Sequence, residues 1–148
     1  MSLEIFTSIN EQQTIKLGEK FASTLVNGDI VSFYGELGFG KTKFIQGICK
    51  KLKVKEIVSS PTYTLINEYN GLNNHKDKVL ISHIDLYRIN NQNELSEIGF
   101  EDIINDLQSI KLIEWAEKSS NLLEFSNYII EFQIAEDKET RNIKIIKL

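Results

Sequence analysis

The sequence predicts an α/β fold in which one sheet of mixed parallel and antiparallel strands is flanked by helices, and two patterns support it. In the first half, short apolar runs typical of buried strands alternate with stretches in which apolar residues recur at helical spacing. In the second half strand-like runs dominate, and the last two, at residues 128–134 and 143–148, fit a C-terminal β-hairpin. Alternating strands and helices favour parallel pairing, and hairpins add antiparallel strands.

Length and composition fit one domain over residues 1–148. The chain is 41% hydrophobic, and a domain of this length buries about 68 to 70% of its unfolded surface. No repeat or linker-like stretch divides it, and Pro61 is the only proline. Its start lacks a basic region followed by an apolar core, and no apolar run could span a bilayer, so we expect a cytoplasmic protein without a membrane anchor. The only cysteine, Cys49, excludes an internal disulfide and falls on a predicted helix face.

The charge balance argues against strong, autonomous binding to nucleic acid. The formal net charge is −4 and the isoelectric point is near 5.3, whereas such binding needs a concentrated positive surface. One local exception is a group of lysines on the helix predicted after residue 40 and at its exit. They are Lys41, Lys43, Lys50, Lys51, Lys53 and Lys55. The group fits a solvated helix face, and it also fits a docking surface for an acidic partner or RNA.

The first predicted helix follows a capping-box pattern at residues 8–11, with Ser8 and Glu11 as its ends. Ile15, Ala22 and Leu25 then fall near one face, and the helix is expected to end around residues 27–28. A buried strand is predicted next.

A glycine-rich run at residues 35–42 (GELGFGKT) fills every required place of the G-x-x-x-x-G-K-[ST] motif. It stands between the strand predicted at residues 30–34 and a helix whose apolar positions are Phe44, Ile45, Ile48 and Leu52. Strand, glycine-rich loop and helix in this order are the context that a phosphate-binding P-loop requires. The alternative is a glycine-rich turn that merely precedes a helix.

The residue types in this motif suit a nucleotide phosphate site. Glycines let successive backbone N–H groups point at phosphate oxygens, next to a helix N-terminus that favours anions. Lys41 is expected to reach the β- and γ-phosphates, and the Thr42 hydroxyl to bind a magnesium ion. The predicted nucleotide-binding positions are Glu36, Leu37, Gly38, Phe39, Gly40, Lys41, Thr42 and Lys43.

Beyond the P-loop helix, most predicted elements are strands. Residues 64–69 and 79–85 could pair as a hairpin across a polar tip at residues 71–78. A short helix is expected after residues 91–94, ended by Gly99, and a strand at residues 110–113.

Two carboxylates end apolar runs and are candidates to complete the site. Asp85 follows the run at residues 79–84, and Glu114 follows the run at residues 111–113. We assign Asp85 to magnesium, through water, and Glu114 to orienting the attacking water or supporting the metal shell. The alternative for each is an ordinary acid capping the end of a strand.

Three further features have two readings each. In residues 60–64 a Thr62 hydroxyl that meets magnesium or the γ-phosphate only in the ATP state would make the segment a switch, whereas the alternative is a turn held by local hydrogen bonds. His83 shares a strand face with Asp85 and is expected to be a hydrogen-bonded polar partner rather than a zinc ligand. Arg88 could supply transition-state charge, but a structural ion pair is favoured.

Four segments together resemble the bacterial TsaE family in residues, order and spacing. They are residues 35–42, 60–65 (SPTYTL), 83–88 (HIDLYR) and 113–115 (IEW). The resemblance spans nearly the full chain and implies a P-loop NTPase domain that binds ATP or ADP with Mg²⁺. By this resemblance Lys41 and Thr42 bind ATP and magnesium, Asp85 matches the metal-site aspartate, Glu114 matches the acidic site residue, and Trp115 matches a tryptophan near the nucleotide.

The resemblance also implies partners. TsaE-like ATPases act in the pathway that makes threonylcarbamoyladenosine in tRNA, with a TsaD-like transferase and its TsaB-like companion. Hydrolysis, weak in the isolated protein, would reset that complex between turnovers, and tRNA would be met only through the complex. Phe39 and Lys43 depart from the family pattern, which has a small residue and a second threonine there.

Other nucleotide-binding functions fit less well. A small-molecule kinase, the main alternative, often uses several arginines on its phosphates, and this chain has only Arg88 and Arg141. A GTPase is disfavoured because the chain lacks Asn-Lys-x-Asp and Asp-x-x-Gly sequences. A nucleotide-gated binding module, in which turnover is incidental, would keep its pathway output when Glu114→Gln removes hydrolysis.

Overall fold

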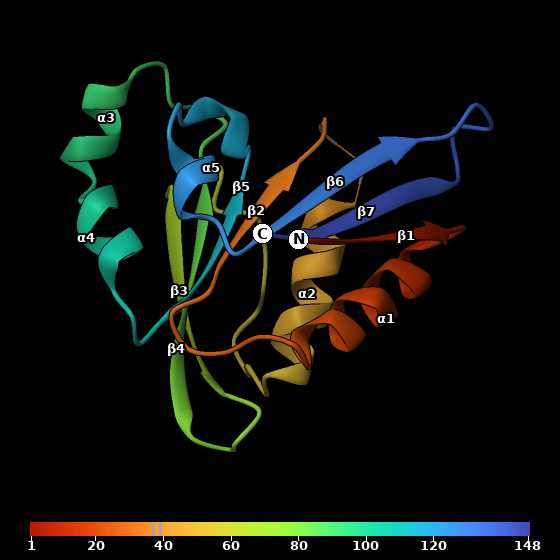
Figure 1. The fold of residues 1–148 in the computed structure, drawn as a ribbon, viewed down its shortest axis with the longest axis horizontal. Helices are drawn as coiled ribbons and strands as arrows, with labels where there is room; N and C mark the ends of the chain where they lie inside the picture. Colours follow the sequence, from red (N-terminus) through yellow and green to blue (C-terminus); the bar gives the residue numbers. More distant parts are fainter. Residues whose placement is uncertain (37, 39) are drawn as a thin grey trace.

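One mixed sheet forms the centre of the molecule (Figure 1). This computed structural model describes residues 1–36, 38 and 40–148, and within them seven strands pair in the order β1-β7-β6-β2-β5-β4-β3. The strands are β1 (Ser2–Ser8), β2 (Ile30–Tyr34), β3 (Ile66–Leu72), β4 (Lys78–Asp85), β5 (Ile110–Glu114), β6 (Tyr128–Ile134) and β7 (Arg141–Lys147).

The strand directions confirm the predicted mixed sheet. Strands β6, β2, β5 and β4 run parallel to one another, whereas β3, β7 and β1 pair antiparallel with their neighbours. Both predicted hairpins, β3–β4 and β6–β7, are present. Because β2 lies between β5 and β6, the loop after it emerges where the carboxyl ends of parallel strands meet, which is the usual ligand-binding edge of such sheets.

Helices cover both faces of the sheet. They are α1 (Glu11–Ala22), α2 (Lys41–Lys51), α3 (Gln92–Glu97), α4 (Phe100–Asn105), α5 (Leu122–Phe125) and the 3₁₀ helix η1 (Ala116–Lys118). Helices α1 and α2 pack on one face, and α3, α4 and α5 lie on the other (Figure 1). Alternate residues of the central strands face the two cores, since Leu112 belongs to the first and Ile113 to the second. In the part of the chain that the structure describes, no helix combines the length and apolarity needed to cross a membrane.

Two glycines let α1 and α2 approach until their backbones touch. A Cβ on Gly18 would lie 2.1 Å from the carbonyl oxygen of Phe44, and a Cβ on Gly47 would lie 2.0 Å from that of Ile15. Any larger side chain would push the helices apart. Cys49, also on α2, is buried in the core, and burial raises the pKa of its thiol to about 12, so it is an unreactive core residue.

The N-terminal segment forms an edge strand, β1, that the sequence did not reveal. Leu3 and Ile5 are 57% and 63% exposed, so the strand lacks the burial alternation that usually identifies one. It is held by backbone pairing with β7 along its whole length.

Helix α1 begins and ends at other residues than predicted. Asn10, not Ser8, is its N-cap: the Asn10 Oδ1 accepts a hydrogen bond from the Gln13 N–H at 2.9 Å. The helix ends at Ala22, short of residues 27–28, because the following residues turn towards β2 and Gly28 has a φ of 93°. Helix α4 was also not predicted, because its six residues are too few to show a clear apolar period.

Candidate functional site

The glycine-rich loop lies at the carboxyl end of β2 and leads directly into α2. Gly40, the N-cap of α2, has a φ of 99°, a left-handed conformation that a residue with a side chain adopts only with strain. At Gly35, whose φ is 133°, a Cβ would lie 2.8 Å from the carbonyl oxygen of Phe132 on β6. The backbone therefore needs glycine at both places. Leu37 and Phe39, two of the predicted nucleotide-binding positions, lie outside the described residues.

A cleft of about 710 Å³ opens beside this loop. It is bounded by the start of α1, Gly38 and Gly40 of the loop, residues 60–63, the ends of β4 and β5, and the turn between β6 and β7. Most of the predicted site residues line it: Gly38, Gly40, Lys41, Thr42, Lys43, Thr62, Asp85, Glu114 and Trp115. Glu36 is exposed and lies outside the lining.

Lys41 is buried at the floor of the loop. Its Nζ donates to the carbonyl oxygens of Gly35 and, at 3.3 Å, Glu36, and it lies 4.0 Å from the centre of the Trp115 ring. Burial lowers the pKa of Lys41, and the carboxylates around it, with Glu114 the strongest, act in the opposite direction. The Lys41 ammonium group thus contacts hydrogen-bond acceptors at the position where the G-x-x-x-x-G-K-[ST] motif would bind a phosphate.

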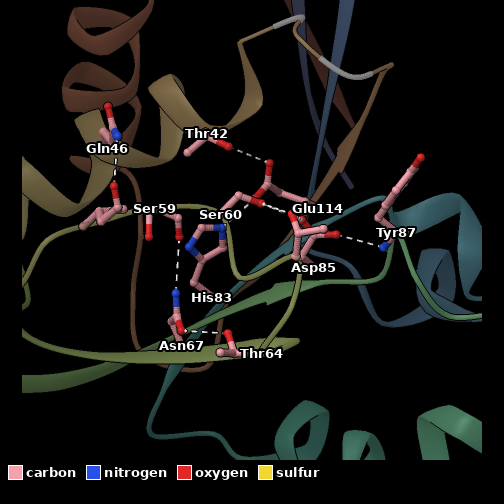
Figure 2. A network of polar contacts seen from close by, with 12 residues as sticks. Thr42, Gln46, Ser59, Ser60, Thr64, Asn67, His83, Asp85, Tyr87 and Glu114 are labelled. Carbon is pink, nitrogen blue, oxygen red and sulfur yellow. Dashed lines mark hydrogen bonds and ion pairs between the residues drawn. The ribbon is translucent and has the colours of Figure 1, made fainter.

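Glu114 and Asp85 come together because their strands are neighbours. They end β5 and β4 and are paired in register. Glu114 is 3% exposed and uses both oxygens: Oε1 accepts from the Thr42 hydroxyl at 3.1 Å, and Oε2 lies 2.8 Å from His83 Nε2. Figure 2 shows Thr42 and Glu114 facing each other at the start of α2.

Asp85 ties the hydroxyl-rich turn to the sheet (Figure 2). Its Oδ2 accepts from the Ser60 hydroxyl at 2.6 Å and from the Thr62 hydroxyl at 3.2 Å. Its Oδ1 accepts from the Tyr87 N–H at 2.8 Å. The sequence did not predict this contact between Thr62 and Asp85. The turn also has a local hydrogen bond between Ser60 and Thr62, as its alternative reading expects, and a switch role for Thr62 stays a prediction.

The donor set around Thr42 suits magnesium. The Thr42 hydroxyl and the two carboxylates offer only oxygen, the ligand type that Mg²⁺ prefers. Among the described residues no three acidic, histidine or cysteine side chains form a metal site by themselves. An ion here would therefore depend on nucleotide oxygens and water for much of its coordination, as Mg²⁺ usually does at phosphate sites.

Trp115 stands half-buried beside the cleft in a left-handed conformation, with a φ of 58°. Its ring centre lies 4.9 Å from that of Tyr87. The indole thus lies between the Lys41 ammonium and an aromatic side chain, which makes its fluorescence a natural reporter of the site.

His83 is the hydrogen-bonded polar residue that the sequence predicted. Its side chain is fully buried and lies between Glu114 and Tyr69. Among the described residues His83 is not part of a group of three or more histidine, cysteine, aspartate or glutamate side chains that could hold a metal ion.

The ion pair favoured for Arg88 is not found among the described residues, and Arg141, for which the sequence predicted no role, lines the cleft. Arg88 lines no part of the cleft, and its guanidinium stacks 5.4 Å from the Tyr63 ring; among the described residues it makes no ion pair. Arg141, from β7, lines the cleft, and its Nη2 donates to the Gly38 carbonyl at 3.3 Å. No sequence signal marks Arg141, because only the folding of the C-terminal hairpin brings it to the loop.

Part of the lysine group is neutralised by α1. Lys43 pairs with Glu11 at 3.6 Å, and Lys50 pairs with Glu19 at 3.0 Å. These pairs fit the reading of a solvated helix face, and the docking surface stays an untested alternative.

The comparison with protein families now decides the family. A family described as "Threonylcarbamoyl adenosine biosynthesis protein TsaE" matches residues 8–143. The chain belongs to the TsaE family. This family acts in the biosynthesis of threonylcarbamoyladenosine in tRNA, and the match confirms the family inferred from the four sequence segments.

Individual TsaE proteins and a solved structure agree with this assignment. The chain is 34% identical to the tRNA threonylcarbamoyladenosine biosynthesis protein TsaE of Haemophilus influenzae, over 93% of this chain and 85% of the relative. It is 34% identical to the TsaE protein of Aquifex aeolicus, over 93% and 92%. The crystal structure of Bacillus subtilis YdiB superposes with a TM-score of 0.76 at 25% identity, over 99% of this chain and 86% of that one.

Proposed function

We propose that this TsaE-family protein is a Mg²⁺-dependent ATPase that hydrolyses ATP in complex with TsaD-like and TsaB-like proteins. The observation that supports it most is the meeting of Lys41 and Thr42 at the start of α2, Asp85 at the end of β4 and Glu114 at the end of β5, three separate parts of the chain, in one cleft. Such a set of one lysine, one hydroxyl and two carboxylates matches the parts that P-loop NTPases use.

Binding would begin at the glycine-rich loop. Phosphate oxygens would replace the carbonyls of Gly35 and Glu36 as partners of Lys41, and they would meet the free N–H groups at the start of α2. Arg141 would add a second cation beside Gly38. Because Lys41 already lies in the loop, little reorganisation is needed.

Catalysis would use the oxygens of Thr42, Glu114 and Asp85, which in this structure take part in hydrogen bonds within the protein. Mg²⁺, when bound, would neutralise the charge that develops on the phosphate oxygens. The Thr42 hydroxyl would leave Glu114 Oε1 for the ion, Asp85 would hold its water shell, and Glu114 Oε1 would orient the attacking water. Thr62, bonded to Asp85, would report the state of the site to residues 60–64.

The predicted partners, TsaD-like and TsaB-like proteins, are inferred from the family and go beyond what its name states. The names of the relatives place them in tRNA threonylcarbamoyladenosine biosynthesis, and in this proposal hydrolysis resets the TsaD-like transferase. Contact with tRNA would be indirect, and a cytoplasmic location stays a prediction.

The deciding experiment is ATP hydrolysis with Mg²⁺ by the chain alone and with a TsaB–TsaD-like complex. We expect slow hydrolysis alone and strong stimulation by the complex, because groups supplied by a partner can raise P-loop hydrolysis on the order of 10³- to 10⁵-fold. Absence of stimulation, with turnover appearing only after a small acceptor is added, would favour a kinase.

A further inference from the structure

A line of three buried side chains runs from the site into the sheet. Tyr69 on β3, His83 on β4 and Glu114 on β5 are 3%, 0% and 3% exposed. The Tyr69 hydroxyl lies 3.1 Å from His83 Nδ1, and His83 Nε2 lies 2.8 Å from Glu114 Oε2. Neither Tyr69 nor His83 lines the cleft. The line thus touches the site only through Glu114.

For a neutral His83 ring, counting donors and acceptors gives one arrangement of the hydrogens along this line. A carboxylate offers only acceptors, so the hydrogen between His83 and Glu114 belongs to His83 Nε2. With Nε2 as donor, Nδ1 of a neutral ring is an acceptor and takes the Tyr69 hydroxyl hydrogen. The Ser59 carbonyl oxygen lies 3.3 Å from the Tyr69 hydroxyl. It has a hydrogen-bond donor without the Tyr69 hydrogen, because the Asn67 amide nitrogen also lies 3.3 Å from it.

The sheet makes this geometry rigid. The three residues come from adjacent strands, and His83 is paired in register with Asn67 and Leu112. Tyr69 and Glu114 are therefore its diagonal neighbours, at a separation that long side chains bridge. Side chains anchored on strands and fully buried have little freedom to reorient.

We propose that His83 is a positioning residue for Glu114 and that Tyr69 sets the orientation of the His83 ring. Resting on the proposed ATPase function, this inference assigns different tasks to the two oxygens of Glu114. His83 holds Oε2 in the protein, so that only Oε1 faces the Thr42 hydroxyl and the cleft. Loss of the Nε2 donor frees the carboxylate to rotate, which lowers turnover and leaves ATP binding intact.

The first test uses nuclear magnetic resonance and needs no activity. The chain has two histidines, and the exposed His75 gives an internal reference. In ¹⁵N spectra of the imidazoles we expect His83 to carry its hydrogen on Nε2. A His83 ring protonated only on Nδ1 could not donate to Glu114 and would overturn the proposal.

The second test compares two replacements of His83 in the full chain with its partner complex. The amide nitrogen of a glutamine reaches the place of Nε2, whereas that of an asparagine reaches only the place of Nδ1. We expect His83→Asn to lower kcat on the order of 10- to 100-fold, the usual cost of losing such a supporting partner. His83→Gln should recover most of the loss. Trp115 fluorescence should give an unchanged Kd for ATP in both.

Tyrosine variants supply the matched control. Tyr69→Phe removes the hydroxyl that orients His83 and should lower kcat several-fold. Tyr128→Phe makes the same change at a buried tyrosine whose hydroxyl, within the described part of the chain, donates to the Thr24 carbonyl at 3.5 Å and to no other group, and it should leave kcat unchanged. Melting temperatures show whether each variant is folded.

The outcomes separate this proposal from the proposed function. If the wild type shows no hydrolysis with its partners, the ATPase function fails, while the ¹⁵N spectrum still tests the histidine. A different result is that the wild type hydrolyses ATP but His83→Asn and His83→Gln have the same kcat, or lose kcat only as much as they lose stability. In that case His83 is merely structural and the proposal is wrong.

Discussion

The α1–α2 contact, at Phe44 and Gly47 along helix α2, and the site, at the start of the same helix, are built in opposite ways. The contact depends on missing side chains: Gly18 and Gly47 let two backbones touch. The site depends on polar side chains such as Thr42 and Glu114, which bond to one another. A change in the first region should alter folding and spare the chemistry, and a change in the second should do the reverse.

The largest stability effect is expected from Gly47→Ala. A Cβ there would meet the Ile15 carbonyl at 2.0 Å, and since backbone cannot step aside, we expect a loss of about 3 kcal/mol, the upper end of ordinary overpacking costs. Helix propensity alone predicts a gain of about 1 kcal/mol. A loss of stability would therefore show that the contact between the two helices determines the effect. Urea unfolding measures it.

Gly99→Ala is the control for this change. Gly99 has a φ of 72° but nothing within 4 Å, so only backbone strain of about 1 to 2 kcal/mol is expected. A Gly47→Ala protein as stable as the wild type would show that the helices separate at no cost.

In the site, the largest functional effect is expected from Glu114→Gln. The amide keeps the shape of the side chain but is a poor acceptor for a water proton, so partner-stimulated hydrolysis should fall on the order of 10²-fold or more. The melting temperature and the Kd for ATP should change little. The exposed Glu117→Gln, three residues along the chain, should hydrolyse ATP like the wild type. Hydrolysis by Glu114→Gln at the wild-type rate would remove Glu114 from catalysis.

Arg141→Ala should have a smaller effect, confined to binding. Arg141 lines the cleft, and one hydrogen bond to a charged group contributes about 1.5 kcal/mol, so ATP affinity should fall about 10-fold by Trp115 fluorescence. Arg88→Ala is the matched control, because Arg88, which stacks 5.4 Å from the Tyr63 ring, is not itself among the residues that line the cleft. Equal losses in both variants would mean that net charge, not position, matters.

The smallest effect is a loss of stability expected at the start of helix α1. Asn10→Ala removes the cap of α1, whose Oδ1 holds the Gln13 N–H at 2.9 Å, and should cost about 1 kcal/mol in thermal or urea unfolding. Asn10→Asp keeps an acceptor and should cost almost nothing. The prediction is wrong if both variants lose the same stability.

The sequence predicted much of the molecule because several of its signals are local. The glycine-rich motif, the strand before it and the helix after it lie within a single stretch, and the structure has all three. Asp85 and Glu114 each end an apolar run, and that rule was enough to place both at the same edge of the sheet.

The failures have equally physical causes. Strand β1 is an exposed edge, with Leu3 and Ile5 facing solvent, so no burial pattern marks it. The helical spacing that predicted α1 could not show that the chain would leave the helix at Ala22. Arg141 received no predicted role because its contact with the loop joins two residues 103 positions apart, Arg141 and Gly38.

The sequence by itself determined the phosphate motif, its helix, the two carboxylates and the family, because backbone conformation and residue chemistry act over a few neighbouring positions. Only the tertiary structure decided which oxygen of Glu114 faces the cleft, that His83 and Tyr69 hold the other, and that the C-terminal hairpin brings Arg141 to the loop. These contacts depend on strand order and register, which are set by packing over the whole chain.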